Sequence, residues 1–149
     1  MDFPILSAII FVPLIGAFFI FITRGTLKTI EKNSTYVAIF SSLANFLLSI
    51  FLWFSFDSSI SDFQFIENRN WMSGLINFQI GIDGISILFI LLTTFIAPVC
   101  IFSGINSIKF KIKEFFIAIL VMESLMLGVF CSLDLVVFYL FFEAGLIPM

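Results

Sequence analysis

Long apolar runs separated by short polar segments dominate this chain. A helix needs about 20 apolar residues to cross about 30 Å of hydrocarbon, at about 1.5 Å per residue. Five runs reach or approach that length, and the first two contain no charged residue. The five runs cover residues 5–23, 36–56, 85–103, 115–133 and 135–149. The pattern therefore predicts an all-α fold, a polytopic bundle of about five transmembrane helices.

The fifth run is the shortest. Leu135 to Met149 gives about 22 Å of helix at the same rise per residue, which is too short for a full crossing. We therefore expect residues 1–149 to form the N-terminal part of a longer membrane domain. The missing C-terminal part of the same subunit would complete the fifth helix.

Basic residues alternate between the loops and predict the orientation. None precedes the first run, three follow it, one follows the second, three follow the third, and none separates the fourth from the fifth. Lysine and arginine concentrate on the cytoplasmic side of membrane proteins. The alternation therefore places the N-terminus outside.

Composition narrows the classes of function. Hydrophobic residues make up 61% of the 149 residues and charged residues only 11%, which is too apolar for a soluble domain of this size, so lipid is an expected partner. The net charge of −3 is scattered, without the basic stripe of a nucleic-acid-binding protein. There is no histidine, and Cys100 and Cys131 are predicted to lie towards opposite membrane faces. We expect neither a disulfide nor a metal site.

Two glutamates lie inside the apolar runs. Glu123 and Glu143 are equally distant in sequence from Leu133, at the predicted turn between the fourth and fifth helices. An antiparallel hairpin would place both carboxyl groups side by side near the bilayer midplane, facing protein. A charged side chain at that depth costs roughly 2.5 to 3.5 kcal/mol, so intramembrane acids indicate ion or proton handling.

Each glutamate also has a structural interpretation, a hydrogen bond to a neighbouring helix. Two carboxylates in a poorly solvated site disfavour joint ionisation, so such a pair can take up and release a proton. No lysine, arginine or histidine lies within the five runs. A basic partner would therefore come from sequence after Met149 or from another subunit. Two further acids, Asp83 and Asp134, precede apolar runs and are predicted to form an Asx turn or cap a helix.

The run from Phe138 to Met149, FYLFFEAGLIPM, resembles the fifth-helix signature of subunit 4 (chain M) of respiratory complex I, the proton-pumping NADH:ubiquinone oxidoreductase. The run from Gly81 to Ser86 is similar to the start of that family's third helix, and the resemblance extends in outline from the segment Phe3 to Leu6 onward. It aligns this chain with about the first third of such a subunit.

The resemblance implies an antiporter-like, proton-translocating subunit of the membrane arm. Such a subunit belongs to an enzyme without holding a redox cofactor, so NADH, FMN, iron–sulfur clusters and ubiquinone are expected in other subunits. Partners would be other membrane-arm subunits, including antiporter-like neighbours. Glu143 matches the family's essential fifth-helix glutamate, which pairs with a lysine on a later, broken helix. Glu123 is the second expected proton-translocation residue.

Two alternatives remain open. The chain could belong to an Mrp-type cation/proton antiporter, in an assembly without NADH or quinone chemistry, or it could be a structural membrane anchor. The codon bias suggested by 23 phenylalanines, together with the form of the fifth-helix motif, favours the mitochondrial inner membrane over a bacterial plasma membrane.

Overall fold

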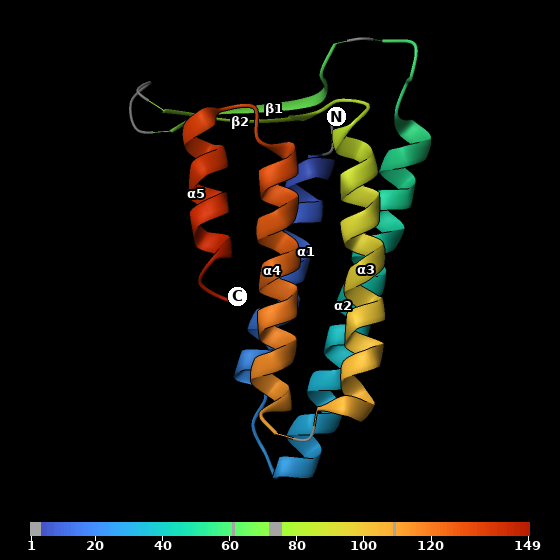
Figure 1. Ribbon diagram of the computed structural model, residues 1–149, viewed down its shortest axis with the longest axis vertical. Coiled ribbons are helices and arrows are strands. Elements are labelled where there is room, and N and C mark those ends of the chain that lie inside the picture. Colours follow the sequence, from blue (N-terminus) through green and yellow to red (C-terminus); the bar gives the residue numbers. More distant parts are fainter. Residues whose placement is uncertain (1–3, 61, 72–75, 109) are drawn as a thin grey trace.

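A computed structural model describes residues 4–60, 62–71, 76–108 and 110–149 (Figure 1). In chain order the elements are α1 (Ile5–Ile22), α2 (Leu27–Ser55), β1 (Gln64–Trp71), β2 (Ile76–Ile82), α3 (Ser86–Ser107), α4 (Ile112–Cys131) and α5 (Leu135–Gly145). Among the described residues, α1 to α4 are long and apolar enough to cross a membrane. Helix α5 is also apolar but shorter.

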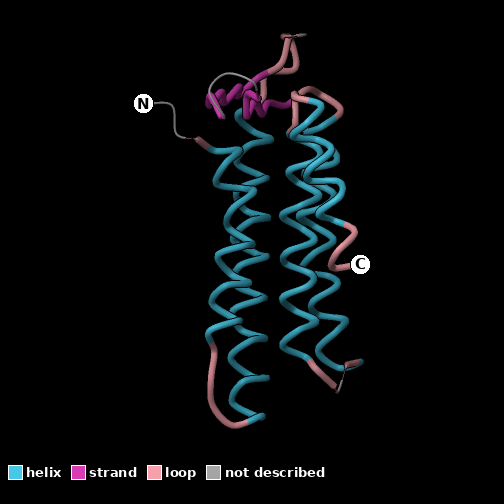
Figure 2. Tube along the Cα trace, turned by 90° about the vertical axis from the view of Figure 1, so that its left-hand side faces the viewer, coloured by secondary structure: helices cyan, strands magenta, loops and turns pink. Residues whose placement is uncertain are grey.

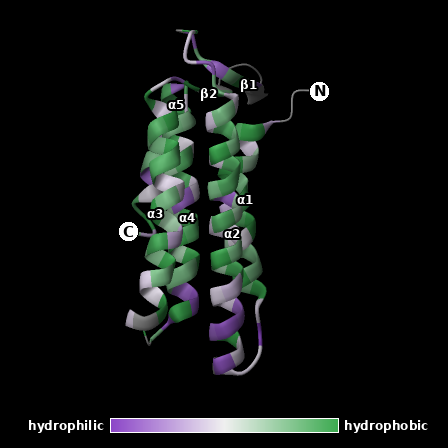
Figure 3. Ribbon diagram, turned by 90° about the vertical axis from the view of Figure 1, so that its right-hand side faces the viewer, coloured by the Kyte–Doolittle hydropathy of each residue, from purple (hydrophilic) through white to green (hydrophobic). Residues whose placement is uncertain are grey.

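The helices form two layers. Helices α1 and α2 lie in one layer and α3, α4 and α5 in the other, as the two side views show (Figures 2 and 3). Helix α4 contacts α1 and α2 across the layers and α3 and α5 within its own layer. The α1–α2 and α3–α4 loops, to which Arg24 and Lys111 belong, lie at one end of the bundle and the β-hairpin at the other (Figures 1 and 3). We refer to these as the basic end and the hairpin end.

The structure confirms the helical bundle and corrects two details of the prediction. Helix α2 begins at Leu27, well before residue 36. The sequence pattern missed this start because most of the first residues of the helix are polar, and the pattern detects only apolar segments. Strands β1 and β2 pair antiparallel where the pattern showed only a polar stretch, so the all-α prediction omitted a hairpin.

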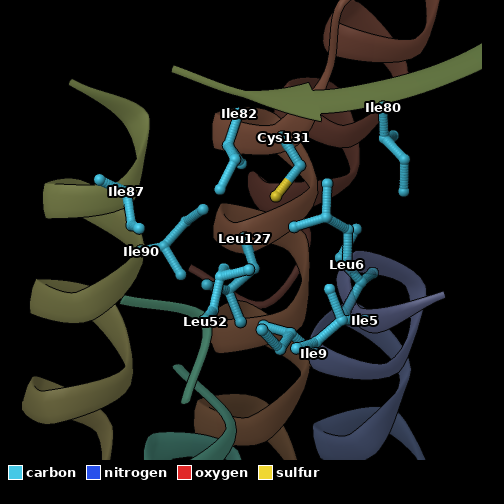
Figure 4. Packing of buried hydrophobic residues seen from close by; sticks show 11 residues of the cluster. Ile5, Leu6, Ile9, Leu52, Ile80, Ile82, Ile87, Ile90, Leu127 and Cys131 are labelled. Atoms are coloured by element: carbon cyan, nitrogen blue, oxygen red, sulfur yellow. The ribbon is translucent and has the colours of Figure 1, made fainter. Parts of the chain in front are cut away.

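The hairpin closes one end of the bundle over an apolar cluster (Figure 4). Ile80 and Ile82 of β2 are fully buried there against α1, α3 and α4. The buried members are Ile5, Leu6, Ile9, Ile10, Leu52, Ile80, Ile82, Ile87, Ile90, Leu127 and Cys131. The backbone N–H of Leu133 donates to the carbonyl of Gln79 at 3.0 Å, which fixes β2 to the α4–α5 turn.

Glu67 of β1 holds the start of α1 against the hairpin. Its carboxylate accepts hydrogen bonds from the backbone N–H of Leu6 at 3.0 Å and of Ser7 at 3.3 Å, and also from the Ser7 hydroxyl. Free N–H groups and the positive end of the helix dipole favour a carboxylate at this position. The hairpin is therefore joined to the bundle by polar as well as apolar contacts.

A second apolar cluster lies nearer the basic end. It contains Ala17, Ile20, Ala38, Ile101, Phe116 and Leu120. Beyond it, the Lys113 ammonium donates to the carbonyl oxygens of Phe21 at 2.8 Å and Thr23 at 3.0 Å. A cation at the carbonyl end of a helix satisfies groups that have no partner within the helix.

Both predicted aspartate turns are confirmed. Asp134 accepts from the N–H of Val136 at 2.8 Å and Val137 at 3.3 Å and caps α5. Asp83 accepts from the N–H of Ile85 at 3.2 Å and Ser86 at 2.7 Å, forming an Asx turn before α3. These side chains fix where the two helices begin.

Replacing Asp83 by alanine should lower the free energy of unfolding by about 0.5 to 2 kcal/mol, the usual loss for such a cap. Hydrogen bonds from Ser86, and more weakly from Ile85, hold the pKa of Asp83 below its ordinary value. Because this pKa is lower in the folded state, the stabilisation is present above the unfolded pKa and is lost as the pH falls through the folded pKa. Thermal unfolding of the detergent-purified protein at several pH values measures this loss of stability.

The difference between Asp83→Ala and the natural protein should shrink as the pH is lowered below the ordinary aspartate range. Asp62→Ala, an exposed aspartate in the loop before β1, serves as the control and should unfold like the natural protein. A difference for Asp83→Ala that is independent of pH would contradict a carboxylate origin of the effect.

Candidate functional site

The two intramembrane glutamates have different surroundings. Helices α4 and α5 form the predicted antiparallel hairpin, through a turn at residues 132–134 (Figure 1). Glu123 faces the interior of the bundle and is only 4% exposed. Glu143 is exposed on α5. The expectation that both carboxyl groups face protein, side by side, is therefore wrong for Glu143 within this chain.

The packing of α5 explains the difference. Val137 is the buried residue of α5, and Phe141, one turn later, lies against Gly128 of α4. Residues spaced by three or four positions share one face of a helix, and Glu143 is not on the face that carries these two. Its neighbours Phe142 and Leu146 are also exposed. A carboxylate on an apolar face at membrane depth is costly unless a further group covers it.

Glu123 is bound by an asparagine from the opposite layer. The amide Nδ2 of Asn45, on α2, donates to Oε1 of Glu123 at 2.7 Å. Asn45 is completely buried. This side-chain bond connects α2 to α4 at the middle of both helices and gives the predicted glutamate a partner that sequence reasoning did not identify.

Further polar contacts lie at the same level. The hydroxyls of Ser49 on α2 and Thr94 on α3 are 2.7 Å apart. The Ser124 hydroxyl donates to the carbonyl of Ile10 on α1 at 2.6 Å. We define the polar layer as the buried polar residues whose side chains bond to another helix, namely Ser41, Asn45, Ser49, Thr94, Glu123 and Ser124. It lies between the two apolar clusters, so the bundle is polar in the middle and apolar on either side.

Two oxygens of the polar layer have no hydrogen-bond partner among the described residues. They are Oδ1 of Asn45 and Oε2 of Glu123, the second oxygens of the two side chains already joined by a bond. Leaving one such buried atom unpaired costs about 1 to 3 kcal/mol. Because native interiors satisfy most buried polar atoms, these two oxygens distinguish Asn45 and Glu123 from the rest of the polar layer.

Periodicity within α2 could have revealed this site. The polar residues of the segment 36–56 recur every three or four positions, at Ser41 or Ser42, Asn45 and Ser49. That spacing places them on one helix face, which is the face turned into the bundle. The sequence interpretation used only the absence of charge in this segment and so missed Asn45.

No group of three or more potential metal-ligating side chains occurs among the described residues. Cys131 is buried in the apolar cluster at the hairpin end, and Cys100 is exposed on α3. The two carboxyl groups offer acid–base chemistry, since Glu123 is buried in a polar layer and Glu143 is exposed on the neighbouring helix.

Fold and site together define a multi-pass membrane protein with acidic groups at membrane depth. No family model matches the chain. The chain is 45% identical to "NADH-ubiquinone oxidoreductase chain 4" of Marchantia polymorpha over 97% of its length. It is 47% identical to "NADH-quinone oxidoreductase subunit M" of Rhodobacter capsulatus, also over 97% of its length. The subunit M of Rickettsia prowazekii (strain Madrid E) is 41% identical over the whole chain.

These relatives confirm the resemblance seen in the fifth-helix signature. The chain spans 29%, 28% and 30% of the lengths of the three relatives, respectively. The same fold occurs in a chain of the membrane-bound sulfane sulfur reductase, an archaeal respiratory membrane complex, with a TM-score of 0.74 and 20% identity. That match covers 99% of this chain and 22% of the other, and it concerns the fold alone.

Proposed function

We propose that this chain is the N-terminal part of a proton-translocating subunit in the membrane arm of an NADH:quinone oxidoreductase. The observation that carries the proposal is that two carboxyl groups belong to adjacent apolar helices, Glu123 of α4 in the polar layer and Glu143 near the end of α5, on its exposed face. The names of the relatives supply the kind of enzyme.

Glu143 is the switching charge in this proposal. Its exposure on an apolar face calls for a basic partner, which we place in the remaining part of the subunit or in a neighbouring one. When the partner is close, the carboxylate is stabilised, and when it withdraws, the carboxylate takes up a proton. Quinone reduction in a distant arm drives that alternation, with NADH, FMN, iron–sulfur clusters and ubiquinone bound by other subunits.

Glu123 is the second proton-translocation residue in this proposal. It lies in a polar layer that reaches α1, α2 and α3, between two apolar clusters that would slow the passage of water and ions. Such a layer can bind a proton without providing an open channel through the bundle. The structural alternative is that the Asn45–Glu123 bond only holds the two layers together.

We expect Glu123→Gln to reduce proton pumping partially while leaving the assembly intact. A glutamine amide can accept from Nδ2 of Asn45 and donate its own N–H to Oδ1, so both side chains remain bonded while the ionisable group is removed. Proton uptake and NADH:quinone activity in membranes that carry the variant measure the effect.

Ser42→Ala is the matched control for Glu123→Gln. Ser42 is equally buried, but its hydroxyl donates only to the carbonyl of Ile39 in its own helix, at 3.1 Å. The control should pump normally. Loss of assembly in Glu123→Gln, as judged by native electrophoresis, would favour the structural alternative over a role in proton transfer.

A further inference from the structure

The bond between Asn45 and Glu123 leaves an unusual arrangement of donors and acceptors. An asparagine amide has N–H donors and one accepting oxygen, whereas an ionised carboxylate only accepts. With Glu123 ionised, Oδ1 of Asn45 and Oε2 of Glu123 are two buried acceptors without a donor. Two acceptors cannot bond to each other until one of them carries a proton.

Neighbouring side chains in the described structure do not provide the missing donor. The hydroxyls of Ser41, Ser42 and Ser124 donate to backbone carbonyls of Val12, Ile39 and Ile10. Those of Ser49 and Thr94 bond to each other and to carbonyls of their own helices.

Apart from Glu123 itself, the charged residues of α1 to α4 lie near the starts of their helices, and the charged residue of α5 is an acid, Glu143, on the exposed face. Helices α1 and α3 contain no charged residue. On α2 the charges are Lys28, Glu31 and Lys32, near its start, and on α4 they are Lys113 and Glu114, also near its start. A cation that would stabilise an ionised Glu123 is therefore absent from this part of the described bundle.

We propose that Asn45 holds Glu123 as a neutral carboxylic acid, in a cyclic acid–amide pair. The amide Nδ2–H donates to Oε1, as the structure shows, and the acid O–H at Oε2 donates to Oδ1. One proton thus gives both unpaired oxygens a partner. Asn45 is then a positioning residue that selects the proton-bearing form of Glu123, and the pair is a proton-holding site within the polar layer.

The pair also determines how the proton can leave. Deprotonation breaks one of the two bonds and leaves two buried acceptors opposed, which a low-dielectric interior makes costly. Release therefore requires a new donor to enter the layer, and water is the simplest one. The role of this proton in pumping rests on the proposed function, whereas the acid–amide pair itself can be tested independently.

Infrared spectroscopy of the purified, assembled complex at neutral pH distinguishes the two forms of Glu123. A protonated carboxyl has a C=O stretch well separated from that of a carboxylate. We expect such a band in the natural protein, its loss in Glu123→Gln, and its shift to higher wavenumber in Asn45→Leu, where the carbonyl loses the Nδ2–H donor. Ser42→Ala should leave the band unchanged.

A second variant covers the case in which Asn45→Leu does not assemble. Asn45→Ala removes the amide without adding bulk or a second acid, so the Glu123 band should again move to higher wavenumber. Absence of any acid band that depends on Glu123 would overturn the proposal, and so would a band that neither Asn45 variant moves. Glu123→Gln could pump normally while the natural protein shows the band and the Asn45 variants shift it. That result would refute only the proposed role of Glu123 in proton translocation.

Discussion

Replacing Glu143 by glutamine is expected to abolish or greatly reduce proton pumping while the complex still assembles. Glutamine keeps the size and hydrogen-bonding capacity of the side chain but cannot ionise. Because Glu143 is exposed within this chain and lies off the face that packs on α4, its charge is not needed to fold the α4–α5 hairpin. If pumping is coupled to quinone reduction, electron transfer should slow as well.

Proton uptake and NADH:quinone activity in membranes with Glu143→Gln provide the measurement, with native electrophoresis as the check on assembly. Glu114→Gln is the matched control, since it removes the same charge from an exposed position in the first turn of α4. That variant should pump normally. Unchanged pumping in Glu143→Gln would remove this residue from the proton path.

The second large effect is expected at the contact between α4 and α5. A Cβ atom added at Gly128 would lie 2.5 Å from the Phe141 ring, closer than two carbon atoms can approach. Overpacking of this kind typically costs about 1 to 3 kcal/mol. We expect Gly128→Ala to displace α5 from α4, to lower thermal stability, and to reduce pumping because Glu143 moves with its helix.

Thermal unfolding and proton uptake of Gly128→Ala test this expectation. Gly84→Ala is the control, because a Cβ at Gly84 meets no described atom within 4 Å. The control should retain both stability and pumping. If Gly128→Ala had the same thermal stability and pumping as Gly84→Ala, the close packing of α5 on α4 would not be what holds the helix that carries Glu143.

The membrane helices were predictable because hydrocarbon thickness fixes both the length and the composition of a spanning segment. The aspartate turns were predictable for a local reason, since an aspartate at or just before a helix start can accept from the N–H groups two and three residues further on. The hairpin was not predictable in this way. Ile80 and Ile82 become core residues only because α1, α3 and α4 meet beneath them.

The candidate site divides in the same way. Glu123 and Glu143 were found because a carboxyl in an apolar run is conspicuous. Their orientations depend on which face of each helix finds a neighbour, as Gly128 and Phe141 decide for α5. The partnership of Asn45 with Glu123 joins residues 78 positions apart, and no local pattern records it.

The most direct test of the account is to isolate this chain from native membranes in mild detergent, together with whatever binds it, and to assay the particle for NADH:quinone reductase activity. We expect an active particle that contains flavin and iron–sulfur subunits and further antiporter-like subunits. A particle of cation/proton antiporter subunits without NADH or quinone chemistry, or the chain without partners, would contradict its assignment to a proton-translocating NADH:quinone oxidoreductase.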